Sequence, residues 1–265
     1  MLLIVLVYYF FTENERKIEV IKIEAKDKKS DSIFTAKHID KGYLFPKPNT
    51  NQVVHHTKYS FSYSENDEQA EWVAYKLFKN SINTSIKRKS NFREDFKVIT
   101  GSSTIQDYKN SGYDRGHLAP AKSMSFNDLT MSESFLMSNM SPQKPSFNRG
   151  VWKKLEEEVR GLLSISDSLY VVTGPVLKHP IGKIGENQVT IPRYYYKTII
   201  RFTSKKLFGI AFLMKNEKSH KSLTSFTVSI DSIEKFTGLD FFNKLEIQTQ
   251  NYIERNSNYR LFLQK

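Results

Sequence analysis

Strand-like and helix-like segments follow one another along this sequence in an order that leaves few architectures open. Val151–Leu163 repeats apolar residues at helical spacing and is the clearest predicted helix. Short segments rich in β-branched and aromatic residues, which are typical of strands, lie on both sides of it. They are Thr57–Tyr63, Leu169–Thr173, Tyr194–Phe202, Phe208–Met214 and Phe226–Ser229. Runs of strands broken by separate helices predict an α+β fold with a central antiparallel sheet flanked by helices.

Two shorter segments also have helical patterns. Within Asp67–Phe78, apolar residues from Ala70 to Leu77 recur at the spacing of one helix face. Asp231–Thr237 suits a short helix that is opened by Asp231 as its cap. These segments add two flanking helices to the predicted architecture.

The first residues, Met1–Phe11, are almost wholly apolar. A membrane-spanning helix needs about 20 such residues, so this segment is short for one. It has the length of a signal-peptide core but lacks a basic start and a small-residue cleavage site. An export signal, a membrane anchor and a buried strand remain as alternatives, with export or anchoring favoured. We therefore expect a secreted, periplasmic or membrane-anchored protein.

The next residues are polar or mixed. Lys17–Lys26 suits either a short strand or a solvated linker, and Asp27–Ser32 is typical of a linker. The compact domain is expected to begin near Tyr43–Pro48. The sequence thus predicts an apolar segment and linker over residues 1–42, followed by one globular domain over residues 43–265.

The charge balance narrows the class of partner. Among 265 residues, 40 Lys and Arg stand against 28 Asp and Glu, which gives a formal net charge of +12. Such a surplus favours nucleic acid, an anionic membrane or an acidic polysaccharide, although a merely basic surface is an alternative. The chain has no cysteine, which excludes disulfides, thiolate metal sites and cysteine nucleophiles.

The segment Tyr113–Pro120 holds residues suited to phosphate chemistry. If it is extended, Arg115 and His117 point to one side and Asp114 to the other, because side chains alternate along a strand. Arginine offers a planar fork to phosphate oxygens, and histidine can take a proton from water near neutral pH. Gly116 allows a backbone or a ligand to approach closely. By itself, so short a pattern favours a structural histidine over a catalytic one.

A second segment, which leads into the helix over Val151–Leu163, offers a cation site. Asn148 lies just before this helix, where asparagine is typical of an N-cap. Glu156 follows after about 80° of rotation beyond two turns and about 12 Å of rise, too far for both side chains to bind one ion directly. A hydrated cation could lie between them, bound by Asn148 directly and by Glu156 through a water, as Mg²⁺ would accept. Taken alone, Glu156 is better explained as part of a solvated face.

Together these segments resemble those of the DNA/RNA non-specific endonucleases, a family that includes mitochondrial endonuclease G and has a ββα-metal (His-Me finger) core. Asp114-Arg115-Gly116-His117 matches the family's hallmark signature. Further matches, in the family's order and spacing, are Asn139, Pro142-Gln143, Asn148, Trp152 and Leu155-Glu156. Gln69–Ala74 is similar to the family's first helix, and the likeness extends over about residues 45 to 245.

The resemblance implies a role for each matching residue. His117 would be the general base, with Arg115 contacting phosphate and Asp114 assigned to substrate binding. Asn148 would bind the metal directly and Glu156 through a water. Asn139 would support the geometry of His117 and the metal. The family also uses an arginine upstream of the signature, for which Arg88 is the best match and Arg93 the alternative.

The implied activity is metal-dependent cleavage of phosphodiester bonds in DNA and RNA with little sequence specificity. One hydrated Mg²⁺ is the expected cofactor, with Mn²⁺ as an alternative. Rival interpretations are an inactive nucleic-acid-binding protein of the same fold and a hydrolase of another phosphodiester. The sequence leaves open whether the protein is a monomer or a homodimer.

Overall fold

The computed structural model describes residues 45–47, 52–79, 81–83, 85–204 and 206–264. The expectations for Met1–Phe11, Lys17–Lys26 and Asp27–Ser32 lie outside the described residues. Within these ranges, no helix is both long enough and apolar enough to cross a bilayer.

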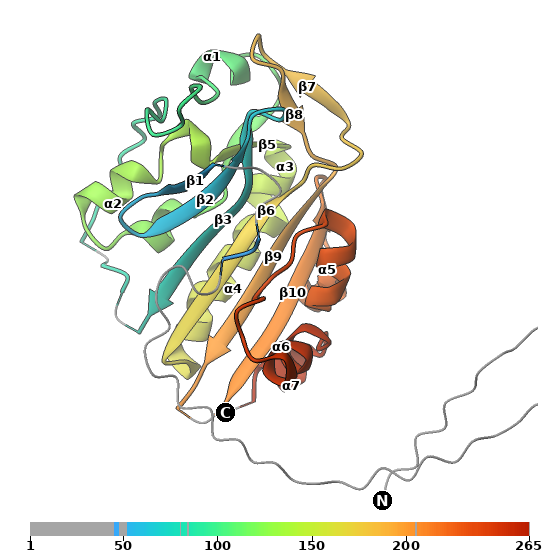
Figure 1. Ribbon diagram of the computed structural model, residues 1–265. Coiled ribbons are helices and arrows are strands. Elements are labelled where there is room, and N and C mark those ends of the chain that lie inside the picture. The colour runs from blue at the N-terminus through green and yellow to red at the C-terminus, as the bar shows by residue number, and fades with distance from the viewer. Residues whose placement is uncertain (1–44, 48–51, 80, 84, 205, 265) are drawn as a thin grey trace, which may run out of the picture. The chain divides into compact units, whose positions relative to one another are not determined.

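A seven-stranded sheet forms the centre of the domain, and every neighbouring pair of strands in it is antiparallel (Figure 1). In spatial order its strands are β1 (Val53–His55), β2 (Tyr59–Ser64), β3 (Gln69–Phe78), β6 (Ser168–Val176), β9 (Tyr194–Phe202), β10 (Leu207–Lys215) and β11 (Thr227–Val228). The chain between the adjacent strands β3 and β6 leaves the sheet, and it contains both segments that predicted the site. A hairpin of β7 (Gly182–Ile184) and β8 (Val189–Ile191) separates β6 from β9.

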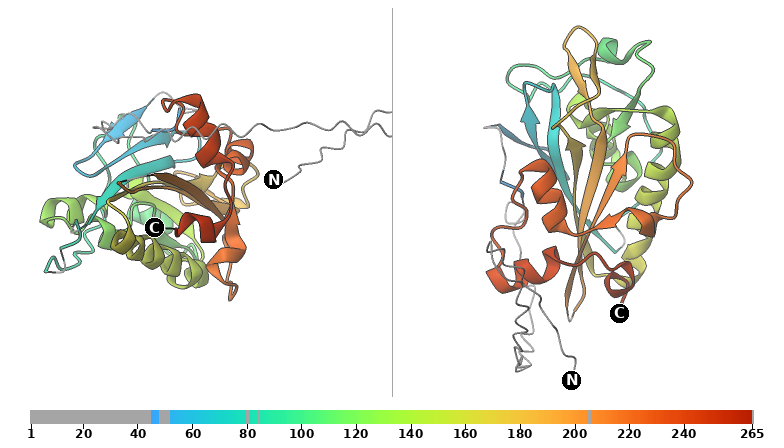
Figure 2. Two further views of the ribbon diagram at one scale, coloured as in Figure 1. Left: turned by 90° about the horizontal axis from the view of Figure 1, so that it is seen from below. Right: turned by 90° about the vertical axis from the view of Figure 1, so that its right-hand side faces the viewer.

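The sheet is buried on both faces, and each face has its own apolar core. One core joins Val73 and Ile199 of the sheet to Leu155 of α4 (Lys153–Gly161). The other joins Trp72 and Ile200 to α5 (Ile230–Thr237) and α6 (Ile247–Glu254). Figure 2 shows the sheet from below, with these helices on its two sides. The predicted α+β architecture with a flanked antiparallel sheet is confirmed.

The remaining helices are short. They are α1 (Ile105–Tyr108), α2 (Asp128–Glu133), α3 (Pro145–Phe147) and α7 (Tyr259–Phe262). Turns of 3-10 helix occupy Ala121–Met124, Met137–Asn139, Leu162–Ile165 and Leu223–Phe226, and a π-helical turn spans Asn148–Trp152.

Three local predictions are wrong. Asp67–Phe78 is not a helix, because Gln69–Phe78 forms the central strand β3. The cap of α5 is Ser229, whose side chain accepts from the Ser232 backbone, while Asp231 lies in the first turn. Asn148 is not an N-cap, because it has helical dihedral angles and continues from α3 into the π-helical turn. The 12 Å estimate for Asn148 and Glu156 assumed a regular α-helix, which this turn interrupts.

Candidate active site

The signature lies on a two-stranded ribbon beside the main sheet. β4 (Asp114–His117) pairs antiparallel with β5 (Met140–Gln143), so that Gly116 lies opposite Ser141 and His117 opposite Met140. A Cβ atom at Gly116 would lie only 2.3 Å from Cδ of Gln143, which explains the glycine by close packing. The ribbon is followed by α3, the π-helical turn and α4, so the site has the predicted ββα order.

His117 lies between two aromatic rings, and an arginine side chain packs over each of these rings. Its ring centroid is 6.0 Å from that of Phe92 and 4.9 Å from that of Phe135. The Arg115 guanidinium lies over Phe92 at 4.2 Å, and the Arg88 guanidinium lies over Phe135 at 4.8 Å. The structure therefore brings Arg88, Arg115 and His117 to one place, as the alternation along β4 predicts for the last two.

The surroundings of His117 keep its imidazole neutral. Burial, together with the positive charges of Arg88 and Arg115, lowers the pKa of His117 from 6.5 to about 3. Its Nε2 atom is buried and has no hydrogen-bond partner among the described residues. A neutral imidazole is the form that a general base requires.

Arg93, the alternative to Arg88, has a different place. Its Nη1 atom donates to the Ser132 carbonyl at 3.0 Å, and its backbone bridges to Leu136. Arg93 thus ties the segment ahead of the signature to the end of α2. Arg88 is exposed beside Phe135, where its charge is available to a ligand.

Asn139 holds the chain that follows His117. Its Oδ1 atom accepts from the Ala119 backbone at 2.8 Å, and its Nδ2 atom donates to the carbonyls of Ala119 and Ser134. The Leu118 backbone donates to the carbonyl of Asn139. Because both hydrogens of its amide are used within the protein, Asn139 is placed as a positioning residue for the end of β4.

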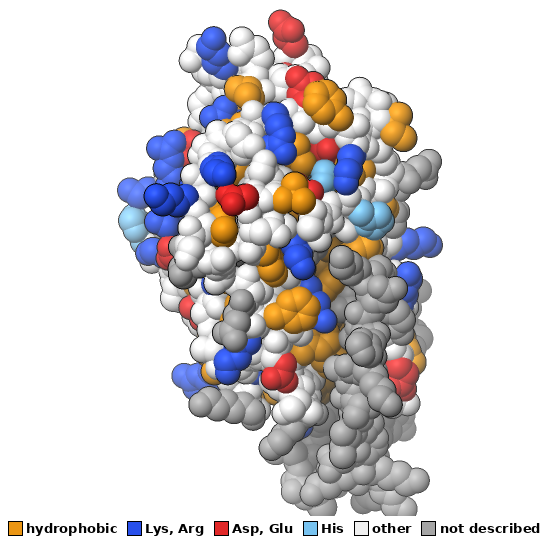
Figure 3. All heavy atoms as spheres, turned by 90° about the vertical axis from the view of Figure 1, so that its left-hand side faces the viewer, with side chains coloured by type: hydrophobic (Ala, Val, Ile, Leu, Met, Phe, Trp, Pro, Cys, Tyr) orange, Lys and Arg blue, Asp and Glu red, His pale blue; other side chains and the backbone are white. Residues whose placement is uncertain are grey.

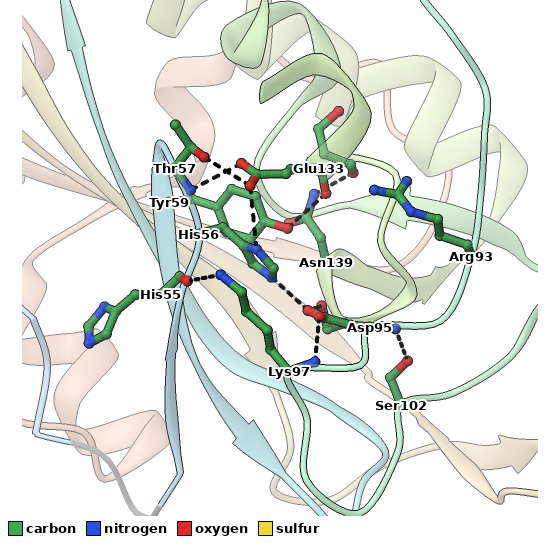
Figure 4. Close-up of polar contacts among 12 residues, drawn as sticks. His55, His56, Thr57, Tyr59, Arg93, Asp95, Lys97, Ser102, Glu133 and Asn139 are labelled. Atoms are coloured by element: carbon green, nitrogen blue, oxygen red, sulfur yellow. Dashed lines mark hydrogen bonds and ion pairs between the residues drawn. The ribbon is translucent and has the colours of Figure 1, made fainter. Parts of the chain in front are cut away.

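A buried polar network lies behind Asn139 (Figure 4). His56 lies between two carboxylates, with Nε2 2.7 Å from Asp95 Oδ2 and Nδ1 3.8 Å from Glu133 Oε1. The hydroxyl of Ser138, the neighbour of Asn139, donates to the same Asp95 oxygen. Burial raises the pKa of Asp95, but hydrogen bonds from His56 and Ser138 outweigh it and keep that pKa below its ordinary value. The network fixes the segment that carries Asn139 against the β1–β2 turn.

Asp114 and Asn148 are in direct contact. Nδ2 of Asn148 donates to Oδ2 of Asp114 at 2.9 Å. Arg149 also donates to both oxygens of Asp114, through Nε and Nη2. Asp114, which the sequence assigned to substrate binding, is therefore held by two protein side chains, and it points to the start of the α4 segment.

Glu156 lies among positive charges near the α4 face of the sheet. Burial raises the pKa of its carboxyl, and Lys197, Arg160 and Arg88 oppose that rise. Lys197 is fully buried on β9, with Nζ 4.8 Å from the Trp152 ring centroid, and this Nζ has no hydrogen-bond partner within the described part of the chain. The charge of Arg88 affects the pKa values of both Glu156 and His117. The carboxylate on α4 therefore lies close enough to the histidine's surroundings to interact with the same arginine.

The sequence did not identify four residues that surround this site, which are Arg160, Lys197, Phe92 and Phe135. For the two charged ones, a local sequence pattern could have indicated their place. Arg160 follows Glu156 at the spacing of one helical turn, and Lys197 is a charge inside an otherwise apolar and aromatic strand. Phe92 and Phe135 had no such pattern, because nothing in the sequence shows that they meet across the site.

Comparisons with known proteins agree with this geometry. Residues 36–248 match the family model described as DNA/RNA non-specific endonuclease. Nuclease C1 of Cunninghamella echinulata var. echinulata is 35% identical over 209 residues, which are 72% of this chain and 82% of the relative. Mitochondrial endonuclease G of Homo sapiens is 31% identical over 209 residues, covering 73% of this chain and 70% of the relative. A chain in the crystal structure of the EndoG/EndoGI complex superposes with a TM-score of 0.72 and 32% identity, covering 78% of this chain and 91% of that chain.

The ribbon, the following helix and the neutral histidine between arginines define a nuclease with a ββα core. The chain belongs to the DNA/RNA non-specific endonuclease family. It is an endonuclease that hydrolyses phosphodiester bonds of nucleic acids with little sequence specificity. Nucleases of this family are metal-dependent.

Proposed function

We propose that this nuclease cleaves both DNA and RNA with His117 as general base and one hydrated Mg²⁺ held by Asn148. The observation that carries the proposal is the placement of neutral His117 between Arg88 and Arg115 on the Phe92–Phe135 pair. A base and two phosphate-binding cations are thereby presented to the same phosphodiester group.

Asn148 fits the role of a metal ligand. A carboxylate only accepts hydrogen bonds, so Asp114 turns the NH₂ group of Asn148 toward itself and leaves the Oδ1 atom for a ligand. An amide oxygen, together with a carboxylate acting through water, suits a hard cation such as Mg²⁺, with Mn²⁺ as the alternative. When bound, the cation would neutralise charge on the phosphate and on the leaving 3′ oxygen.

The arginines give His117 a basicity that depends on substrate. In the free protein, their positive charges disfavour protonation of the imidazole. A phosphodiester paired with Arg88 and Arg115 cancels much of that charge, so the pKa of His117 rises when substrate binds. His117 then takes a proton from water, the water oxygen attacks phosphorus in line, and the 3′ oxygen leaves.

Broad substrate use follows from the kind of contact that the surface offers. Figure 3 shows Lys and Arg side chains spread over the face that it draws, with one group of them near its left edge. Contacts from such side chains to phosphates carry no base information, and they weaken as salt concentration rises.

The test separates binding from cleavage in a single variant. His117→Ala should bind DNA as tightly as the wild type at matched salt, while its cleavage rate falls by about 10²–10⁴. His220→Ala, which changes an exposed histidine, is the matched control and should cleave normally. If His117→Ala cleaves at the rate of the wild type, His117 is not the base. If the wild-type protein itself binds DNA but does not cut it with any added metal, the protein acts only in binding.

We also propose that Met1–Phe11 directs export or anchors the chain. The support is its apolar composition and its length. Expression with and without residues 1–42, followed by fractionation of cells and medium, tests this. Equal distribution of the two forms would contradict it.

A further inference from the structure

Three carboxylates meet on the face of the sheet opposite α4. Asp231 and Glu234 lie three residues apart on α5, and Glu254 is the last residue of α6. One oxygen of each lies within 4.8 Å of the others. Both helices pack on the second core through Ile233 and Ile253, so this cluster and the ββα unit lie on different faces of the sheet.

Glu254 supplies an independent sign that this cluster takes a ligand. Its side chain comes from a different helix, the residue is only 4% exposed, and its Oε1 atom has no hydrogen-bond partner among the described residues. Burial, together with the negative charges of Glu234, Asp231 and Asp240, raises the pKa of Glu254 to about 8. A hydrogen bond with Gln250 opposes this rise without cancelling it. A buried carboxylate oxygen that is left unpaired among other carboxylates costs free energy, unless a proton or a cation compensates it.

We propose that Asp231, Glu234 and Glu254 bind a divalent cation of the Ca²⁺ class, which ties α5 to α6. Carboxylate oxygens are the ligands that such hard cations take. Ca²⁺ takes about six to eight oxygen ligands in a flexible shell, whereas Mg²⁺ is usually bound through only one or two carboxylates, so a set of three carboxylates favours Ca²⁺. Asp231 and Glu234 are partly exposed, so water can complete the coordination shell.

The site would be structural and separate from catalysis. The ion would join the start of α5 to the end of α6, and both helices contact β10. It would also replace the proton on Glu254, because one cation neutralises the carboxylates that otherwise repel each other. Binding should therefore stabilise the fold without taking part in cleavage.

The experiment counts bound Ca²⁺ by equilibrium dialysis at pH 8.5 and follows thermal unfolding in chelator and in Ca²⁺. Glu254→Gln should bind one equivalent of Ca²⁺ fewer than the wild type, or bind that equivalent at least tenfold more weakly. Any Ca²⁺ bound at the catalytic site should be the same in both proteins. In chelator this variant should be at least as stable as the wild type, because it removes a buried acidic charge, and added Ca²⁺ should raise its Tm less. Glu246→Gln changes an exposed acid just before α6 and is the matched control, which should behave as the wild type.

The outcomes separate a cation from a proton. Equal Ca²⁺ stoichiometry and an equal Tm response in the wild type and in Glu254→Gln would overturn the proposal, leaving Glu254 as a protonated acid. Mg²⁺ matching Ca²⁺ at this site would overturn the assigned class. If Glu254→Gln does not fold, Asp231→Asn, which removes a partly exposed ligand of the same site, gives the same comparison. DNA cleavage in Mg²⁺ should be unchanged in Glu254→Gln, so failure here leaves the nuclease mechanism unaffected.

Discussion

The Nδ2 atom of Asn148 donates a 2.9 Å hydrogen bond to Oδ2 of Asp114. This bond joins the first residue of the signature to the candidate metal ligand. It also determines which end of the Asn148 amide faces a cation, because a carboxylate has no hydrogen to donate. In the proposed metal site Asp114 would therefore position Asn148, in line with its expected place on the side of β4 away from Arg115 and His117, while its assignment to substrate binding stays a prediction.

Asp114→Asn should loosen that orientation. The new amide can present either its oxygen or its nitrogen to Asn148, so the Oδ1 atom of Asn148 is no longer held for the cation. The Mg²⁺ concentration for half-maximal cleavage should rise by roughly 10- to 100-fold, the usual effect of losing such a support. Arg149→Ala removes the other partner of Asp114 and should have a smaller effect. Equal Mg²⁺ dependence in Asp114→Asn and the wild type would contradict this role.

His117 should not titrate between pH 5 and pH 8 in the free protein. Its pKa is lowered to about 3, so the imidazole stays neutral as pH falls through this range and gains its proton only in stronger acid. NMR of the ring protons, assigned by their loss in His117→Gln, measures this directly. Addition of inorganic phosphate should raise the pKa, because the anion offsets Arg88 and Arg115. A pKa near 6.5 that phosphate does not move would show that neither burial nor the arginines control His117.

The Gly116–Gln143 contact gives a stability prediction. Gly116 does not have a positive φ, so alanine at this position is limited only by space. Its Cβ would lie 2.3 Å from the Gln143 side chain. Gly116→Ala should destabilise the protein by about 1–3 kcal/mol in urea unfolding, the usual cost of overpacking. The double variant Gly116→Ala/Gln143→Ala should recover part of this loss, and the absence of recovery would place the strain elsewhere.

Local sequence patterns predicted the elements whose two faces differ or whose composition is strongly biased. Tyr194–Phe202 was predicted with its observed bounds, and α4 lies within the predicted Val151–Leu163 helix. β3 was missed because it is central: Gln69–Tyr75 is buried on both sides, so no alternation marks it as a strand. Its alanines and valine then matched a helical spacing by chance.

The site was predictable where its residues are close in sequence. Asp114 to His117 form one strand, so their chemistry could be inferred together. The pairs that support them join distant segments: Asp114 meets Arg149 across 35 residues, and His56 meets Asp95 across 39. No local pattern encodes such pairs, because they depend on how the insertion between β3 and β6 folds back on the sheet.

The last prediction concerns Lys197 and Glu156. Lys197 is fully buried and Glu156 is half-buried. Burial shifts the pKa of each toward the neutral form, and the charge of each opposes the shift of the other. Lys197→Met would remove a positive charge that keeps Glu156 ionised, so the pKa of Glu156 should rise further. A neutral carboxyl accepts hydrogen bonds from metal-bound water less well, and cleavage should then be lost at a higher pH than in the wild type.

The acid limb of the cleavage rate at saturating Mg²⁺ measures this effect, and it should move up by at least about 1 on the pH scale. Thermal stability should stay equal or increase, since a buried charge without a hydrogen bond is replaced by an apolar side chain of similar length. Lys206→Met, which changes an exposed lysine just before β10, is the control. An unmoved acid limb together with a lower Tm would show that Lys197 serves only packing, through Trp152 and Tyr75.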